Sequence, residues 1–416
     1  MARRDGRLGV DPKGDEDQIS QCVILIGGLG TRLGELTKQV PKPLLPVGNR
    51  PFIDFLIFEA KRRGFHKLLL LAGHRSEVVI DYVKDGRLEE RFGISVKVAV
   101  ETSPLGTGGA LINALPLLDD AFLLLNGDTW FDFNWRDLVY QTRLANAPAA
   151  MALRQIDNPD RYETIELSGS IVRAIRPRRP LIGSALINGG VYYLTKAAIL
   201  GFSTPSSLEN DIFPSMQEES FLHAFSYQGF FIDIGVPETY EAAQKLVASQ
   251  VTRPAVFFDR DGVLNVDHGY VHSPADLTWI AGAKLAVKTL NDAGFYVFVV
   301  TNQAGVARGF YEEGAVTLLH EFMNKQLLES GGYIDDWRYC PFHPEGVVLE
   351  YKSEHPWRKP EPGMILDLLK SWPVKTVESF LVGDKESDVA AANAAGIAGY
   401  LFDGTNLTEL IKKLVS

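Results

Sequence analysis

The sequence predicts an α/β protein with two domains. Short apolar runs alternate with amphipathic stretches, which is typical of parallel or mostly parallel sheets covered by helices. The alternation starts afresh in the second half, after a helical stretch that ends before Pro254. A length of 416 residues also exceeds what one hydrophobic core usually organises. We therefore expect the domain boundary near Val251.

The apolar runs are predicted to be buried strands. Each is short, rich in aliphatic or aromatic residues and bounded by polar or turn-forming residues, which favours strands over helices. The first domain is expected to have strands at residues 22–26, 67–72, 96–100, 121–125 and 149–153. The second is expected to have strands at residues 255–259, 296–301, 380–384 and 399–402, with helices over 285–294 and 316–330.

Composition indicates a soluble globular protein, with 46% hydrophobic and 23% charged residues and no apolar stretch long enough to span a membrane. The net charge of -10 argues against nucleic acid as a partner. Cys22 and Cys340 provide no disulfide framework, which predicts a cytoplasmic location. The basic N-terminus lacks the apolar segment of a secretory signal, so residues 1–19 are expected to form a flexible tail.

A glycine-rich stretch, GGLGTRLGELTKQVPKPL, follows the first predicted strand. The missing side chains of Gly27, Gly28 and Gly30 would let backbone N–H groups approach the oxygens of a triphosphate. Arg32 and Lys42 add cations within the same stretch. The alternative for such a loop is a simple tight turn.

Two acidic residues of the first half each follow an apolar strand: Asp128 in NGDTWFD and Asp233 in FIDIGVPETY. Carboxylates placed in this way are suited to share a magnesium ion, which prefers oxygen ligands and substrate phosphates. Otherwise each aspartate caps a turn.

Together with PLGTGGAL at 104–111, these motifs resemble the sugar-phosphate nucleotidyltransferase family, from residue 20 to about residue 248. This family joins a sugar 1-phosphate to a nucleoside triphosphate and releases pyrophosphate. The resemblance implies a Rossmann-like domain with a mostly parallel mixed sheet over residues 20–250. Alignment of the reacting groups and stabilisation of the developing charge suffice for this chemistry, so no covalent intermediate is needed.

The resemblance also implies roles for individual residues. Lys42 would neutralise charge at the α-phosphate, and Asp128 and Asp233 would bind Mg²⁺. The nucleotide would be bound by Gly27, Gly28, Gly30, Thr31, Arg32, Glu101 and Gly106. The sugar phosphate would be bound by Asn188, Gly189, Glu209, Asn210 and Arg176.

The sequence departs from the family pattern at two places. Where the family has Glu-Lys-Pro, this chain has Ile175 and Arg176, and arginine keeps the charge of lysine but not its geometry. Ile26 replaces a small residue, which would narrow the base pocket. A weakened or altered transferase is therefore the alternative.

In the second half, FFDRDGVLN delivers Asp259 and Asp261 at the end of a predicted strand. The first is suited to be a nucleophile, and the second a proton donor to the leaving alcohol and then a base for water. Downstream residues supply a hydroxyl donor, a cation and further carboxylates, namely Thr301, Lys359, Asp384 and Asp388. This combination resembles the haloacid dehalogenase (HAD) phosphatase superfamily and implies a Rossmannoid domain over residues 254–416, with Mg²⁺ bound by Asp259, Asp261 and Asp384.

Two further motifs, NVDHGYVH and VVTNQAGVARG, are similar to those of heptose 1,7-bisphosphate 7-phosphatases and, to a lesser degree, histidinol phosphatases. The similarity implies that Asn302, Arg308 and Arg358 bind substrate. The alternative for the arginines is a solvated surface charge. The same family carries a zinc loop, but here Phe342 replaces its histidine, and His355 and Trp357 replace cysteines. A structural zinc site needs four ligands, whereas Cys340, His343 and His355 offer three at most, so we predict no structural zinc.

The two resemblances predict consecutive reactions. A phosphatase would convert heptose 1,7-bisphosphate to heptose 1-phosphate, and a transferase would then consume that product, with GTP as the implied nucleotide and Mg²⁺ in both domains. Another sugar phosphate or nucleotide is one alternative. In another, only the phosphatase is active and the first half is a nucleotide-binding or oligomerisation module. A homo-oligomer is compatible with the sequence.

Overall fold

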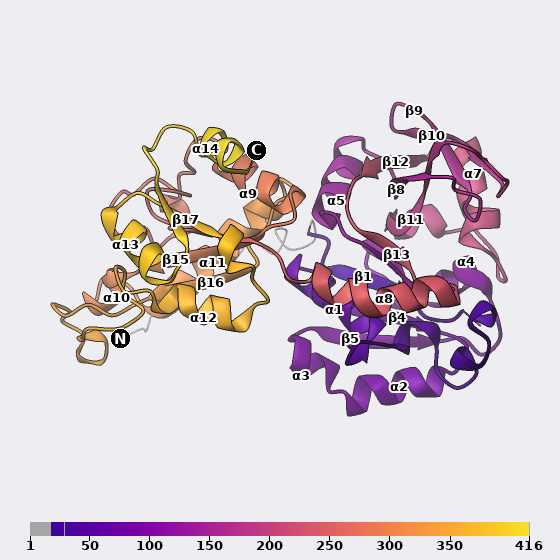
Figure 1. Ribbon diagram of the computed structural model, residues 1–416, viewed down its shortest axis with the longest axis horizontal. Helices are drawn as coiled ribbons and strands as arrows, with labels where there is room; N and C mark the ends of the chain where they lie inside the picture. The colour runs from indigo at the N-terminus through magenta and orange to yellow at the C-terminus, as the bar shows by residue number, and fades with distance from the viewer. Residues whose placement is uncertain (1–17, 29, 416) are drawn as a thin grey trace, which may run out of the picture.

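The structure is a computed structural model that describes residues 18–28 and 30–415. Two α/β bodies lie side by side in Figure 1, and the chain passes from the first to the second after helix α8 (Pro237–Gln250). The predicted α/β class is confirmed. Most of the predicted N-terminal tail lies outside the described residues, but Ile19 is buried and its carbonyl oxygen accepts a hydrogen bond from Arg136.

The sheet of the first body has the strand order β5-β4-β1-β6-β11-β8-β12-β10-β9. From β5 to β6 the strands pair in parallel, whereas β11 runs antiparallel to both of its neighbours. A separate ladder joins β7 (Thr129–Phe131) to β13 (Phe231–Asp233), and β2 (Pro46–Val47) pairs with β3 (Arg50–Pro51). The sheet strands are β1 (Gln21–Leu25), β4 (Lys67–Ala72), β5 (Ser95–Val100), β6 (Ala121–Asn126), β8 (Ala149–Asp157), β9 (Thr164–Ser168), β10 (Ile171–Arg176), β11 (Ser184–Thr195) and β12 (Leu222–Tyr227).

Both faces of this sheet are buried. Since neighbouring residues of a strand point to opposite faces, they enter different cores. Ile24 packs in a core with α1 (Phe52–Arg62), α5 (Trp135–Leu144) and α8. Val23 packs in a separate core with α4 (Gly106–Asn113) and α7 (Phe213–Glu218). The other helices of this half are α2 (Ser76–Asp85), α3 (Leu88–Phe92) and α6 (Lys196–Ile199).

The sheet of the second body has the order β16-β15-β14-β17-β18, and its strands pair in parallel. Its central strand AVFF is fully apolar because helices cover both faces. The strands are β14 (Ala255–Phe258), β15 (Tyr296–Asn302), β16 (Asp336–Cys340), β17 (Phe380–Gly383) and β18 (Ala398–Leu401). The helices are α9 (Ala283–Asp292), α10 (Ala304–Ala307), α11 (Glu313–Leu328), α12 (Gly363–Ser371), α13 (Glu386–Ala394) and α14 (Leu407–Val415). Within the described residues, no helix is both long and apolar enough to cross a membrane.

The structure contains strands that the sequence analysis did not predict, notably β9 to β12 and β16. Strand β11 includes Gly189 and Gly190, and its register with β8 shifts between Asn188 and Tyr192. Glycines weaken a strand pattern, which explains why this one was missed. Strand β16 reads DWRYC and lies at the sheet edge, where the apolar run expected of a central strand is not required.

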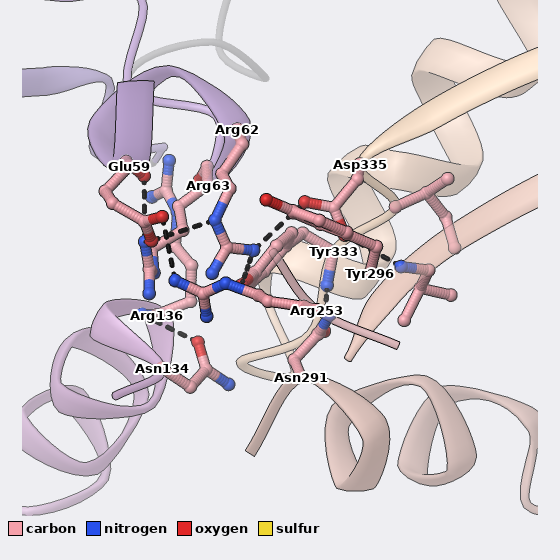
Figure 2. Close-up of polar contacts among 12 residues, drawn as sticks. Glu59, Arg62, Arg63, Asn134, Arg136, Arg253, Asn291, Tyr296, Tyr333 and Asp335 are labelled. Carbon is pink, nitrogen blue, oxygen red and sulfur yellow. Dashed lines mark hydrogen bonds and ion pairs between the residues drawn. The ribbon is translucent and has the colours of Figure 1, made fainter. Parts of the chain in front are cut away.

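The two bodies meet through a buried cluster of charges (Figure 2). Glu59 of α1 is fully buried; its Oε2 accepts a hydrogen bond from Arg62 Nε at 2.9 Å and also contacts Arg63. Its Oε1 accepts one from Arg253 Nη2 at 2.8 Å, and Arg253 lies between α8 and β14. One carboxylate therefore connects the first body to the connecting segment.

Arg62 extends this cluster into the second body. Its Nη1 donates to Tyr333 Oη at 2.9 Å and to Asp335 Oδ1 at 3.0 Å (Figure 2). A second polar contact lies nearby, where Lys288 of α9 pairs with Asp137 of α5 at 2.6 Å. Because the Arg62 contacts are buried, we infer that the two bodies hold a defined relative orientation.

We predict that Glu59→Gln lowers the free energy of unfolding at pH 7 by about 3–5 kcal/mol, because it leaves buried guanidinium groups without a counter-charge. Burial alone would raise the pKa of Glu59, but Arg253, Arg62 and Arg63 outweigh burial and hold the pKa below its usual value. A depressed carboxyl pKa stabilises the fold above the unfolded-state value of about 4.3, and this stabilisation is lost as the pH falls. Urea unfolding should therefore show a smaller difference between variant and wild type at low pH.

The matched control is Glu378→Gln, because Glu378 is an exposed residue paired with Lys375 within one turn. This change is expected to shift the unfolding free energy by no more than about 0.5 kcal/mol. Equal losses from the two substitutions would contradict the assigned role of Glu59.

Candidate active sites

The glycine loop that follows β1 packs closely against the neighbouring strand ends. A side chain at Gly27 would begin 3.2 Å from both Glu101 Oε1 and Gly73 N. Gly30 has φ +62°, a left-handed conformation that favours glycine, and its carbonyl oxygen accepts a hydrogen bond from Thr37 Oγ1 at 2.9 Å. The backbone at Gly27 and Gly30 can therefore pack this closely only because these residues have no side chain.

The β7–β13 ladder brings the predicted metal-binding carboxylates of the first half together. Asp233 pairs in register with Thr129, which follows Asp128 directly, and Ile234 N donates to Asp128 O at 2.8 Å. Lys42 Nζ donates to Asp128 Oδ2 at 2.8 Å. The side chains of Lys42, Asp128 and Asp233 line a cavity of about 310 Å³. Its lining residues are Gly30, Thr31, Arg32, Lys42, Asn126, Asp128, Thr129, Tyr162, Arg178, Asp233 and Gly235.

The donors of this cavity fit magnesium. Carboxylate oxygens are the ligands that Mg²⁺ prefers, and substrate phosphates usually complete its coordination. The same carboxylates also contact protein donors: Asp128 pairs with Lys42, and Asp233 contacts the Tyr162 hydroxyl and, at 3.6 Å, Arg161. These donors would have to release the carboxylates when a metal binds.

Two more cavities adjoin the glycine loop. One, of about 180 Å³, is lined by residues that include Ile26, Gly28, Thr107 and Glu209, and Thr107 Oγ1 donates to Glu209 Oε2 at 2.8 Å. The other, of about 210 Å³, is lined by Gly27, Gly73, His74, Glu101, Thr102, Ser103 and Pro104.

Glu101 is the acidic residue of that cavity. Burial raises the pKa of its carboxyl group, while a hydrogen bond from Leu105 N at 3.0 Å opposes the rise. Gly106 follows with φ +78° and packs beneath Ser206 O. The predicted nucleotide-binding residues Gly27, Glu101 and Gly106 thus lie in one region of the molecule.

Of the residues predicted to bind the sugar, one lines a cavity and others contact protein groups. Glu209 lines a cavity, as described above, but Asn188 Nδ2 donates to Tyr192 Oη at 2.8 Å. Gly189 packs against the ring of Phe131, where a side chain would collide. Asn210 is exposed and donates to Ser207 Oγ at 3.2 Å.

Arg176 lies in β10 and forms an ion pair with a residue of the neighbouring strand β9. Its guanidinium donates to both carboxylate oxygens of Glu166, at 2.9 and 3.0 Å. Arg178 instead lines the cavity with Asp128 and Asp233. The sequence analysis had not singled out Arg178, and the only signal available was its position within the IRPRRP run.

In the second half, the carboxyl ends of adjacent parallel strands assemble the predicted phosphatase residues. Asp259 follows β14, Thr301 lies near the end of β15, and Asp384 follows β17. Gly262 has φ +89°, and a side chain there would collide with the Asp384 carboxylate. The turn after Asp261 can therefore approach Asp384 only because residue 262 is glycine.

Lys359 is the central cation of this site. Its side chain is buried, with Nζ 2.9 Å from Asp259 Oδ1 and 2.6 Å from Asp388 Oδ1. Burial raises the pKa of Asp259 to about 6; Lys359 opposes the rise, and the charges of Asp388 and Asp261 add to it. The site thus holds clustered carboxylates with one buried ammonium group between two of them.

Carboxylate oxygens of Asp259, Asp384 and Asp388 lie within 4.8 Å of one another. Among the residues that the structure describes, Asp384 Oδ1 is buried and has no hydrogen-bond partner. An unpaired oxygen among hard donors fits Mg²⁺. Asp261, which was also expected to bind Mg²⁺, is not in this group; its side chain lies 2.9 Å from Arg260, and its role as a ligand stays a prediction.

The phosphatase cavity has a volume of about 470 Å³. Arg308, predicted to bind substrate, is not among the lining residues and lies 3.7 Å from Glu345, so its role stays a prediction. Contributors that the sequence analysis did not name include Tyr270, Gln303, Tyr311 and Lys385. The lining residues are Asp259, Asp261, Asp267, Gly269, Tyr270, Thr301, Asn302, Gln303, Ala304, Tyr311, Arg358, Lys359, Lys385, Ser387 and Asp388.

The loop at the position of the family's zinc site is held by ring packing and hydrogen bonds. Phe342 stacks on His355 with ring centroids 4.2 Å apart, and Trp357 N donates to His355 Nδ1 at 3.1 Å. Cys340 is buried, with Sγ 4.0 Å from Phe342 O. The absence of structural zinc stays a prediction.

With these geometries defined, comparison with known families identifies the class of protein. The nucleotidyl transferase family model matches residues 21–250, and the HAD-hydrolase-like model matches residues 356–409. The chain therefore belongs to the nucleotidyl transferase family and carries a HAD-like domain behind it. The resemblance to both families predicted from the sequence is confirmed.

Individual relatives match each half, two of them over almost their full length. A D-glycero-beta-D-manno-heptose-1,7-bisphosphate 7-phosphatase from Rhodopseudomonas palustris is 48% identical over 170 residues, 41% of this chain and 94% of that protein. A D-glycero-alpha-D-manno-heptose 1-phosphate guanylyltransferase from Campylobacter jejuni is 34% identical over 224 residues, 53% of this chain and 96% of that protein. A mannose-1-phosphate guanyltransferase from Yarrowia lipolytica is 31% identical over 56% of this chain and 65% of that protein. The prediction of an enzyme with phosphatase and nucleotidyltransferase domains is confirmed.

We predict that Mg²⁺ binding to the second domain weakens as the pH falls below about 6, because a proton then competes for Asp259, whose pKa is raised to about 6. The dissociation constant should rise about tenfold per pH unit below that value. Calorimetric titration with Mg²⁺ in buffers of different ionisation enthalpy would measure both the affinity and the proton released. The pH-dependent component should be missing from Asp259→Ala, and a constant affinity between pH 5 and 7.5 in the wild type would contradict the prediction.

Proposed function

We propose that this protein catalyses two consecutive steps in the synthesis of a nucleotide-activated heptose. The second domain would remove the 7-phosphate of D-glycero-D-manno-heptose 1,7-bisphosphate, and the first would transfer GMP from GTP to heptose 1-phosphate with release of pyrophosphate. The observation that carries the proposal is that one chain holds both domains, and that relatives of both halves are named for D-glycero-D-manno-heptose phosphates. The names differ in anomer, beta for the phosphatase and alpha for the guanylyltransferase, so the proposal requires the second domain of this chain to act on the alpha anomer.

In the phosphatase reaction, an oxygen of Asp259 attacks the phosphorus of the 7-phosphate. The bond to the sugar oxygen breaks as Asp261 donates its proton to the leaving alcohol. Asp261 then takes a proton from the water that attacks the aspartyl phosphate, which releases inorganic phosphate and restores Asp259. Lys359 offsets the negative charge throughout, since its Nζ lies 2.9 Å from Asp259 Oδ1. Mg²⁺ held by Asp259, Asp384 and Asp388 would add to that charge compensation.

In the transfer reaction, an oxygen of the sugar 1-phosphate attacks the α-phosphorus of the nucleotide and pyrophosphate leaves. The glycine loop with Thr31 and Arg32 holds the triphosphate, and Lys42 moves from Asp128 to the α-phosphate. The site needs only to align the reactants and stabilise the developing charge. Mg²⁺ held by Asp128 and Asp233 would offset phosphate charge. Both proposed domains, residues 20–250 and 254–416, would therefore require Mg²⁺.

Glu101 supports guanine as the base. Guanine presents two adjacent N–H donors, N1–H and the N2 amino group, on one edge, and a carboxylate can accept both. Adenine, cytosine, uracil and thymine do not offer two adjacent donors on that edge. Glu101 lines a cavity beside the glycine loop, which is where the base of a bound triphosphate would extend.

Arg178 takes the role first expected of Arg176. It faces the carboxylate cavity, whereas Arg176 is bound by Glu166. A cation here would bind the sugar phosphate and reduce its repulsion from the triphosphate. The two buried free cysteines and the need for nucleoside triphosphates support a cytoplasmic setting.

The deciding experiment is phosphorus NMR on the full-length protein with Mg²⁺, a mixture of nucleoside triphosphates, and the α and β anomers of the heptose bisphosphate in separate samples. We expect inorganic phosphate followed by a GDP-sugar signal from the α anomer. Asp259→Asn should abolish phosphate release but spare transfer to supplied heptose 1-phosphate, whereas Lys42→Ala should have the opposite effect. Inorganic phosphate without a nucleotide sugar would reject the transferase, and parallel loss of both activities would reject two separate sites.

We predict that Arg178→Ala lowers kcat/KM for nucleotidyl transfer about 10- to 100-fold, the range expected when a charge-assisted hydrogen bond is lost. Arg178→Lys should restore part of the rate because it restores the charge. Arg176→Ala is the matched control and should change kcat/KM by less than about threefold, since Arg176 serves a surface ion pair. A larger effect at Arg176 than at Arg178 would return the role to Arg176.

A further inference from the structure

The phosphatase cavity contains a buried glutamine for which the proposed mechanism has no role. Gln303 follows the last residue of β15 and is 2% exposed. Its backbone N donates to Cys340 O at 2.8 Å, which ties it to the end of strand β16. Its side chain therefore enters the site from a fixed backbone position.

The orientation of the Gln303 amide follows from its partners. Its Oε1 accepts hydrogen bonds from Arg260 Nη2 at 3.1 Å and from Tyr311 Oη at 2.8 Å. A guanidinium group can only donate, so the carbonyl oxygen must face Arg260. The NH₂ group then points to Asp261 Oδ2 and Thr301 Oγ1, each at 2.9 Å.

These contacts join two groups that act on the substrate. Asp261 is the proposed proton donor, and Thr301 the proposed hydroxyl donor to phosphate. Since Thr301 Oγ1 accepts from Gln303, its own hydrogen is left to donate elsewhere. One amide therefore orients both groups.

Asp261 is further held by Arg260, the residue between the two aspartates. The Arg260 side chain is fully buried, and its Nε and Nη2 lie 3.2 and 3.0 Å from Asp261 Oδ1. Asn265 Nδ2 donates to the same oxygen at 2.9 Å. Arg260 Nη2 also lies 2.9 Å from Asp261 Oδ2, so Gln303 is the neutral donor that shares this oxygen with Arg260. Without Gln303, Arg260 would hold Oδ2 without the opposing amide.

Tyr311 braces the amide from the cavity side. Its ring stacks on His272 at 4.5 Å with an interplanar angle of 9°. Burial raises the pKa of Tyr311 to about 12, so the hydroxyl keeps its proton and remains a donor to Gln303 near neutral pH. The amide is thus bonded to Arg260, Tyr311, Asp261 and Thr301, whereas an apolar side chain of similar volume would fill the same space without these contacts.

We propose that Gln303, braced by Tyr311, is a positioning residue that holds Asp261 in line to donate its proton to the leaving oxygen of the substrate. The inference rests on the proposed phosphatase function and on the roles of Asp259 and Asp261. It concerns the step in which the sugar alcohol departs, because an alkoxide is a poor leaving group and needs that proton.

The test compares leaving groups. The 7-oxygen of the heptose bisphosphate leaves as a primary alcohol, whereas 4-nitrophenolate leaves readily without a proton. We expect Gln303→Met to lower kcat/KM for the bisphosphate by about 100-fold or more, the usual contribution of a general acid, and for 4-nitrophenyl phosphate by less than about tenfold. The ratio kcat/KM is chosen because it reports transfer of the phosphoryl group to Asp259, before the hydrolysis that both substrates share.

Two further variants separate positioning from structure. Tyr311→Phe removes a hydroxyl and should give the same selectivity with a smaller loss, so the test does not depend on the folding of Gln303→Met. Gln326→Met is the matched control, because Gln326 lies in α11, does not line the phosphatase cavity, and accepts its hydrogen bond from Trp279 Nε1. It should leave both substrates within about twofold of wild type.

Equal losses on both substrates, or no loss on the bisphosphate, would overturn the proposal. A wild-type protein that releases no phosphate from either substrate would instead reject the phosphatase function. The two failures are therefore distinguishable.

Discussion

The arrangement of this protein depends on buried carboxylates that are balanced by buried cations. Glu59 shows the principle at the contact between the two bodies, where Arg62, Arg63 and Arg253 surround it. Transfer of any of these groups from water would be costly alone, and their mutual attraction recovers that cost only when the geometry is maintained. Arg62 also binds Asp335 of the second body, so the compensation requires both bodies to be in place.

Cations also balance carboxylates at both active sites, in a partly buried pair in the first domain and in buried pairs in the second. Lys42 pairs with Asp128, and Lys359 lies between Asp259 and Asp388. In each case the cation offsets carboxylate charge within the site. In the proposed reactions, phosphate groups would take over part of this pairing. This explains how a protein with a net charge of -10 can handle polyanionic substrates through local cations rather than through a basic surface.

The two halves also solve the problem of placing charged groups in the same way. Parallel strands end at one edge of a sheet, and loops at that edge can carry charged groups while the strands remain apolar. Asp259, Thr301 and Asp384 are collected in this manner from β14, β15 and β17. The glycine loop after β1 occupies the corresponding place in the first half. In the proposed function, fusion of the two domains would keep the phosphatase and the transferase that uses its product at equal abundance.

Sequence by itself determined the fold class, the central strands and the residues of both motifs. A run of apolar residues such as that in AVFFD predicts a strand with both faces covered by helices. Motifs such as FFDRDGVLN place their reactive side chains within a few residues of each other. The edge strand β16 and the glycine-interrupted β11 were missed because their stability comes from neighbouring strands rather than from their own residues.

Tertiary structure decided which charged side chains meet. Arg176 and Arg178 both lie in the run IRPRRP, but Arg176 pairs with Glu166 in the β9–β10 hairpin and Arg178 lines the cavity. Asp388 rather than Asp261 joins the carboxylate group because Arg260 holds Asp261. Such choices depend on distances of a few ångströms between residues far apart in the chain, and a linear pattern carries no information at that scale.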